Sequence, residues 1–111
     1  MSLNQVVVVG NLTEDPRKGN TASVTVANMR MASDFRVTDP EGNKIERTEY
    51  VDVEAYGVMG ENCLASLRKG SRVIVAGSLR YDEWQDSEGN KRSKLKVKAS
   101  VVGDSLEFAK K

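Results

Sequence analysis

The pattern of this sequence places three aromatic side chains outside the expected core. Polarity alternates along residues 45–56 and 71–84, and in each segment the small apolar residues share one parity. Tyr50, Tyr56 and Trp84 have the other parity, which predicts that they project from the outer faces of strands. Exposed rings stack on nucleic-acid bases of any sequence, at about 1–3 kcal/mol each. Stacking on a single-stranded nucleic acid is therefore one chemistry open to these residues.

Basic side chains accompany the rings. Residues 91–98 contain five of them and no acid, and three form a row of period two (Lys94, Lys96 and Lys98). Arg72 and Arg80 have the parity of Trp84. Cations placed beside stacking rings neutralise phosphates. A lysine row alone is usually only a solvated strand face, so the combination of rings and cations carries the interpretation, and a protein partner on the outer aromatics is the alternative.

Carboxylates supply a competing hypothesis. Asp52 and Glu54 share one strand face, and Asp82 with Glu83 could join them as a divalent-metal cluster for a nuclease. The sequence places no lysine or histidine base beside them, and their neighbours are other polar residues of strand faces. Ordinary surface acids therefore explain these residues better than a catalytic centre.

The composition favours binding over catalysis. The chain has 111 residues, enough for one domain, and it contains no histidine, which removes the usual general base and metal ligand. The single cysteine, Cys63, excludes an internal disulfide and is expected in the core. We expect no metal and no cofactor.

Charge is distributed unevenly along the chain. Lys and Arg number 17 against 16 Asp and Glu, a net charge of +1. Residues 70–111 nevertheless carry +3, whereas residues 36–69 carry −2. The N-terminus has neither a basic start nor a long apolar stretch, so a soluble protein of the cytoplasm is expected.

Valine-rich segments bounded by turn residues predict five strands, over residues 4–12, 22–35, 45–56, 71–84 and 91–102. A loop with Asp15, Pro16 and Gly19 is expected after the first strand. In the second strand, Val24 and Val26 differ in parity from Ala27, Met29 and Met31, which predicts a bulge or a strong bend. The expected core residues of the last three strands share one parity: Val51, Val53, Ala55, Val73, Val75, Gly77, Leu79, Leu95, Val97, Ala99 and Val101.

One short helix is predicted over residues 60–69. Apolar residues there have helical spacing, Arg68 and Lys69 would lie in its last turn, and Gly70 would end it in the left-handed conformation. Nearly identical turn sequences at residues 39–44 and 86–91 predict two long hairpins. Phe35, Tyr81 and Trp84 would lie near their tips, where an aromatic has little core to join.

The order of three strands, one helix and two strands predicts an all-β fold, the five-stranded oligonucleotide/oligosaccharide-binding (OB) barrel. Another small β-rich roll would also fit the pattern.

Short motifs in the same order along nearly the whole chain resemble the bacterial single-stranded DNA-binding protein family. They are Val9-Gly10-Asn11-Leu12, Asp15-Pro16, Val26-Ala27-Asn28, Leu67-Arg68-Lys69-Gly70-Ser71 and Gly77-Ser78-Leu79-Arg80 with Trp84. The resemblance implies a non-catalytic OB barrel that assembles as a homotetramer. It also implies binding of single-stranded DNA during replication, recombination and repair.

The resemblance assigns base stacking to Phe35, Tyr50, Tyr56 and Trp84, with Phe35 requiring a shift of about one residue in the intervening hairpin. Four positions at which relatives often carry cations are here Asp52, Val58, Asp82 and Glu83. Phosphate contacts are therefore expected from the remaining basic residues: Lys69, Arg72, Arg80, Arg92, Lys94, Lys96 and Lys98.

The resemblance also bears on partners. Family members usually continue into a flexible linker and an acidic tip, so residues 1–111 are expected to be a single binding domain without that tail. Replication and repair proteins are expected as partners only if the full-length form has a tail. The Val6–Val9 run is the expected contact between subunits. The alternative function is an OB-fold protein-interaction or primosome-type module with weak DNA binding.

Overall fold

A closed barrel positions the candidate residues. The computed structural model describes residues 4–19 and 23–107. The elements are β1 (Val6–Leu12), β2 (Arg17–Lys18), β3 (Val26–Thr38), β4 (Lys44–Tyr56), α1 (Gly57–Ser66), β5 (Arg72–Gln85) and β6 (Lys91–Asp104). The sheet order is β1-β5-β6-β4-β3-β2, and β1 also pairs with β3, which closes the five long strands. The predicted all-β barrel with a helix between its third and fourth long strands is confirmed.

The second strand differs from the prediction. Its expected start at residue 22 lies outside the described residues. All 13 residues of β3 pair with β4 in one continuous register, from Val26 opposite Tyr56 to Thr38 opposite Lys44, so of the two predicted alternatives, a bulge or a strong bend, the bulge is wrong. The parity change arises because Val26 and Ala27 are both buried where the strand begins. The loop expected around Pro16 contains β2, which pairs with β3.

The helix lies three residues earlier than predicted. Gly57 begins it directly after β4, and Leu67 ends it in an extended conformation. Arg68 and Lys69 are therefore not in its last turn, which corrects the prediction. Gly70 does adopt a positive φ of 90°, but within a separate turn in which the Ser71 amide donates to the Arg68 carbonyl. Within the described residues, no helix is long and apolar enough to cross a membrane.

The barrel core follows the predicted parity over most of its length. The buried cluster includes Val53, Ala55, Val73, Val75, Val97, Ala99 and Cys63. Burial raises the pKa of the Cys63 thiol. The rest of the cluster consists of Leu12, Ala27, Met29 and Met31, as expected for a chain with few aromatic residues.

A bulge in β6 overturns one core prediction. The β5–β6 register shifts between Ala76, opposite Val101, and Gly77, opposite Ala99, so Ser100 is an extra residue. An extra residue reverses the side to which later side chains point. Val102 consequently packs against the core, and Val101 is exposed, contrary to the prediction.

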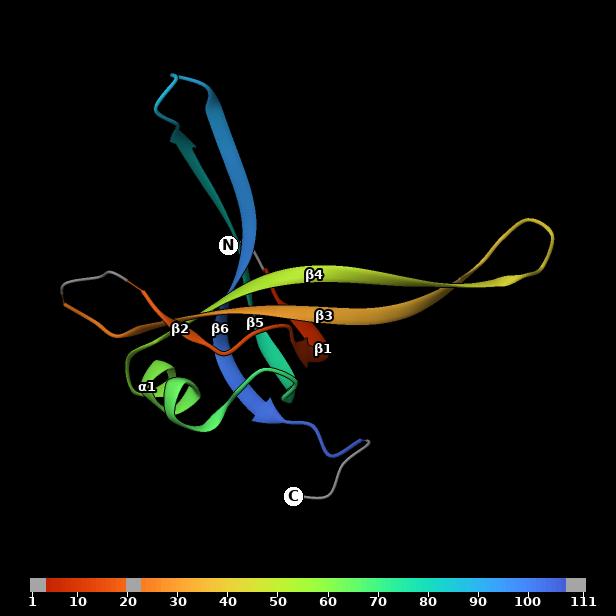
Figure 1. The fold of residues 1–111 in the computed structure, drawn as a ribbon, viewed down its shortest axis with the longest axis horizontal. Helices are drawn as coiled ribbons and strands as arrows, with labels where there is room; N and C mark the ends of the chain where they lie inside the picture. Colours follow the sequence, from red (N-terminus) through yellow and green to blue (C-terminus); the bar gives the residue numbers. More distant parts are fainter. Residues whose placement is uncertain (1–3, 20–22, 108–111) are drawn as a thin grey trace.

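Two hairpins extend beyond the barrel, β3–β4 and β5–β6, and they project in different directions (Figure 1). Leu79 and Leu95 have the core parity but lie on the projecting part of β5–β6, where they are exposed, so their predicted burial is wrong. In each turn one aspartate, Asp39 or Asp86, accepts hydrogen bonds from the backbone amides two and four residues later. The shared turn chemistry of the two hairpins is thereby confirmed.

Gly77 allows the close approach of β5 to β6. A Cβ atom at this position would lie 2.1 Å from the Lys98 carbonyl oxygen. We expect Gly77→Ala to lower the free energy of unfolding by about 3 kcal/mol, because backbone rather than a flexible side chain must move. The measurement is denaturant unfolding. Gly103→Ala is the control, since no atom lies within 4 Å of its added Cβ, and a similar loss in both variants would contradict the explanation.

Candidate nucleic-acid interface

One face of the barrel collects most of the predicted residues. Cross-strand partners point to the same side of a sheet, and the register places Ala32 opposite Tyr50, Glu54 opposite Lys98, and Arg80 opposite Lys96. The even-numbered residues 28–34, 50–56, 78–84 and 92–98 therefore form one surface across β3, β4, β6 and β5, called the outer face below. A hollow of about 520 Å³ on it is lined by Tyr56, Arg80 and Lys98, among others.

The three rings on this face are accessible to different degrees. Tyr50 is 58% exposed and Trp84 48% exposed, whereas Tyr56 is half-buried. The Arg30 guanidinium lies 4.9 Å from the centre of the Tyr50 ring, and the Lys98 ammonium lies 5.0 Å from that of Tyr56. Each tyrosine thus has a cation over one face of its ring.

Tyr56 is also held by its hydroxyl. The phenol donates a hydrogen bond of 2.9 Å to Glu54 Oε1. This bond, reinforced by burial, raises the pKa of Tyr56 because a neutral phenol can donate and a phenolate cannot. The ring orientation is therefore fixed before any ligand arrives.

The lysine row is paired with carboxylates. Lys94 lies 3.1 Å from Asp52, and Lys96 lies 2.8 Å from Glu54 and also contacts Asp82. Hydrogen bonds to Asp82 and then to Glu54 raise the pKa of Lys96. Asp52, Glu54 and Asp82 are three of the four carboxylates that the sequence offered as a divalent-metal cluster. Over residues 4–19 and 23–107, no group of three or more His, Cys, Asp or Glu side chains could hold a metal ion.

The remaining predicted cations of the outer face lie toward the β5–β6 hairpin. Arg92 is opposite Trp84 and donates to Asp86 at 3.0 Å. Arg80 is exposed and, within the part of the chain that the structure describes, has no ion-pair partner. Eight of the predicted site residues are thus brought together: Tyr50, Tyr56, Arg80, Trp84, Arg92, Lys94, Lys96 and Lys98.

Three predicted residues lie elsewhere. Phe35 pairs with Arg47 and has the parity opposite to that of Tyr50, so the two rings project from opposite sides of the β3–β4 pair. The Lys69 amide donates to Asp15, beside the turn that follows α1. Arg72 lies at the opposite end of β5 from Trp84.

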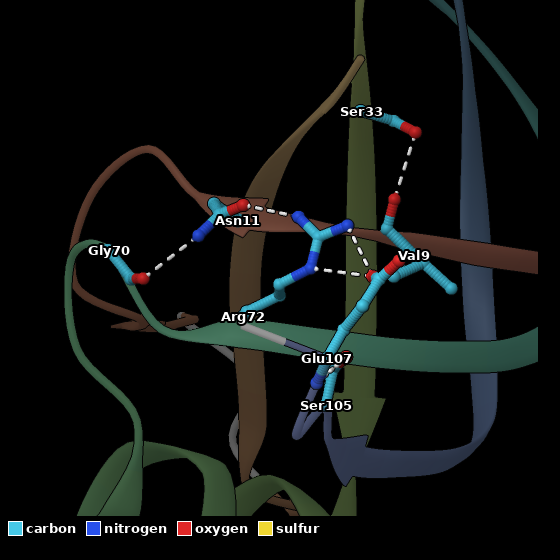
Figure 2. A network of polar contacts seen from close by, with 7 residues as sticks. All are labelled: Val9, Asn11, Ser33, Gly70, Arg72, Ser105 and Glu107. Carbon is cyan, nitrogen blue, oxygen red and sulfur yellow. Dashed lines mark hydrogen bonds and ion pairs between the residues drawn. The ribbon is translucent and has the colours of Figure 1, made fainter. Parts of the chain in front are cut away.

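Arg72 belongs to a polar network at that end of the barrel (Figure 2). Its guanidinium donates to Asn11 Oδ1 at 2.7 Å and to Glu107 Oε1 at 2.9 and 3.2 Å. Asn11 in turn donates to the Gly70 carbonyl. The network ties β1, β5 and the segment after β6 together, which is a structural role independent of the outer face.

Sequence reasoning missed Arg30. The alternation of Met29, Arg30 and Met31 was sufficient to place it on an outer face, since both methionines are buried. Its contact with Tyr50 adds β3 to the strands that supply cations.

The barrel closure, its single inserted helix and the outer face of rings and cations define an oligonucleotide-binding type of OB fold. The family model "Single-strand binding protein family" matches residues 3–106, and the chain belongs to this family.

Individual relatives agree with the family match. A protein of Corynebacterium glutamicum named single-stranded DNA-binding protein is 42% identical over 108 residues, covering 95% of this chain and 48% of that protein. Single-stranded DNA-binding protein 2 of Chlorobaculum tepidum is 35% identical, covering 90% of this chain and 69% of that protein. A crystal structure of a deletion mutant of the single-stranded DNA-binding protein from Thermus aquaticus superimposes with a TM-score of 0.84 at 29% identity, covering 96% of this chain and 52% of that one. The chain thus spans about half to two thirds of the length of these proteins.

Asp86 fixes the turn of the hairpin that carries Trp84. Its carboxylate accepts two backbone amides and the Arg92 guanidinium, which holds the pKa of Asp86 below its ordinary value of 3.8. A depressed pKa stabilises the folded turn above the ordinary pKa, and this stabilisation is lost as pH falls through the folded value. We expect a carboxyl NMR titration of Asp86 with a midpoint below 3.8. A midpoint at or above that value would contradict the role of these bonds.

Proposed function

We propose that this protein binds and protects single-stranded DNA without sequence preference and without catalysis. The observation that carries the proposal is the outer face, on which Tyr50, Tyr56 and Trp84 stand clear of the core beside basic side chains. Every base has a π-face, so stacking on these rings tolerates any sequence. The names of the relatives, single-stranded DNA-binding proteins, support the same function.

In this proposal the phosphates are neutralised by the exposed cations of the outer face: Arg30, Arg80, Arg92, Lys94 and Lys98. A longer strand that leaves this face would meet Phe35, Lys69 and Arg72. We further propose that residues 1–111 act as one binding unit. It would serve replication, recombination and repair in the cytoplasm, at the nucleoid, and replication and repair proteins would be partners only through a C-terminal tail in the full-length form.

An apolar patch supports assembly into a homotetramer. Val7 lies opposite Ala76, and Ala76 lies opposite Val101, so side chains of β1, β5 and β6 adjoin on the outside of the barrel. Val7, Val101 and the nearby Ile74 are exposed. A second copy of the chain would cover this patch, as was expected from the Val6–Val9 run.

A protein-interaction module remains the second candidate. The observation in its favour is the reverse side of the β5–β6 hairpin, where Leu79, Tyr81 and Leu95 are exposed. Such a module would leave Trp84 fluorescence unchanged by DNA.

Titration of the protein with oligo-dT tests DNA binding through Trp84, the only tryptophan of the chain. We expect strong quenching, with log affinity falling by about 0.7 per neutralised phosphate per log unit of salt. Trp84→Ala should weaken binding by about 1–3 kcal/mol, measured by anisotropy of labelled DNA. Tyr81→Ala, which removes a similarly exposed ring from the other side of the hairpin, is the control. Equal losses in the two variants would argue against the outer face.

A charge in the apolar patch should dissociate the assembly. Val101→Glu is expected to lower the molar mass measured by light scattering, because a carboxylate cannot be desolvated there without a partner. Leu95→Glu is the matched control, since Leu95 is 59% and Val101 60% exposed. Dissociation by Leu95→Glu alone would move the interface to the hairpin, and a monomeric native protein would refute the tetramer.

A further inference from the structure

Lys96 differs from the other cations of the outer face in its surroundings. Its side chain is 19% exposed, against 50% for Lys94 and 60% for Arg92. It lies in β6 between both neighbouring strands and contacts Glu54 of β4 and Asp82 of β5. Its ammonium is therefore enclosed by two carboxylates from opposite sides.

A phosphate would be a poor replacement for these partners. To reach it, Lys96 would have to leave Glu54 or Asp82, and the Glu54 side chain is only 17% exposed. An enclosed carboxylate without its cation is unfavourable, and a nearby phosphate would repel it. The counterions released on binding are those condensed on the nucleic acid, and a lysine whose charge is already balanced by carboxylates displaces them poorly, so the usual gain on binding is largely absent.

Glu54 gives Lys96 a second connection to the binding surface. Its Oε2 accepts from Lys96, while its Oε1 accepts from the Tyr56 hydroxyl. The ammonium, the carboxylate and the phenol thus form one chain of hydrogen bonds that ends on a ring expected to stack on a base.

We propose that Lys96 is an internal counter-ion of the outer face, which balances one of the two negative charges of Glu54 and Asp82 and orients Tyr56 without taking a phosphate. This inference rests on the proposed DNA binding and replaces the phosphate role expected from the lysine row. Lys96 is thus a positioning residue. The face would bind a single strand through fewer phosphates than its basic residues suggest, and with correspondingly weak salt dependence.

Salt dependence separates this role from phosphate binding. The experiment compares Lys96→Gln with Arg80→Gln, which removes one positive charge from the opposite position of β5. Oligo-dT affinity is measured at several monovalent salt concentrations. Arg80→Gln should make the slope of log affinity against log salt shallower by about 0.7. Lys96→Gln should change the slope far less than this while weakening binding about fivefold, as expected for a phosphate roughly 6 Å from one additional unpaired carboxylate at a dielectric constant of about 60, a distance at which salt screens the repulsion only in part.

A rescue experiment tests the counter-ion role directly. Asp82→Asn added to Lys96→Gln should restore most of the affinity at the native slope, because it returns the net charge of the Lys96, Glu54 and Asp82 cluster to its native value. Glu83→Gln is the matched control: it removes the same charge one residue away, from the opposite side of β5, and should not restore affinity. The Lys96→Gln/Asp82→Asn variant conserves net charge, so it also serves if Lys96→Gln alone folds poorly.

The outcomes distinguish the two proposals. If the native protein does not bind oligo-dT, the proposed function fails. If it binds and Lys96→Gln or the double variant has a slope shallower by about 0.7, Lys96 contacts a phosphate and the counter-ion role is overturned. Equal rescue by Asp82→Asn and Glu83→Gln would also overturn it, because the effect would then be one of net charge.

Discussion

The close contact between the paired strands β5 and β6 at Gly77 is the constraint on which both the outer face and the apolar patch depend. The β6 backbone passes so close to Gly77 that a side chain there has no room, and the extra residue Ser100 is accommodated next to this contact. Before the bulge, even-numbered residues of β6 point outward and form the lysine row. After it, Val102 turns inward and Val101 outward. One local irregularity thus changes the outside of β6 from basic to apolar within three residues.

This change places two surfaces with different interactions on one small barrel: stacking and ionic contacts on the outer face, and apolar burial at the patch around Val101. The outer face contains charged side chains, which are favourable in water without a ligand, and rings, which can stack on a base of any type. The patch around Val101 contains side chains that gain stability only when another apolar surface covers them. Because the surfaces lie on successive stretches of the same strand, the proposed assembly through the patch would leave the outer face uncovered.

The sequence predicts the fold and the central rings, but not the details that depend on partner strands. Alternation in residues 45–56 places Tyr50 and Tyr56 outside because β4 is undisturbed there. The same reasoning fails for Val101, since a bulge depends on the register of the adjacent strand, and for Leu95, since alternation does not reveal where the barrel ends. The paired state of Lys96 requires Glu54 and Asp82, which lie 42 and 14 residues away along the chain.

These ion pairs lower the positive charge that the outer face presents, in keeping with the net charge of +1 of the chain. Asp52, Glu54 and Asp82 neutralise lysines of the neighbouring strand, so counting basic residues overestimates the field that a phosphate meets. Under the proposed function, stacking would then supply a larger share of the binding free energy, and stacking is less sensitive to salt than phosphate contacts are. The carboxylates that suggested a metal site in the sequence thereby become part of how the outer face limits its own electrostatic attraction.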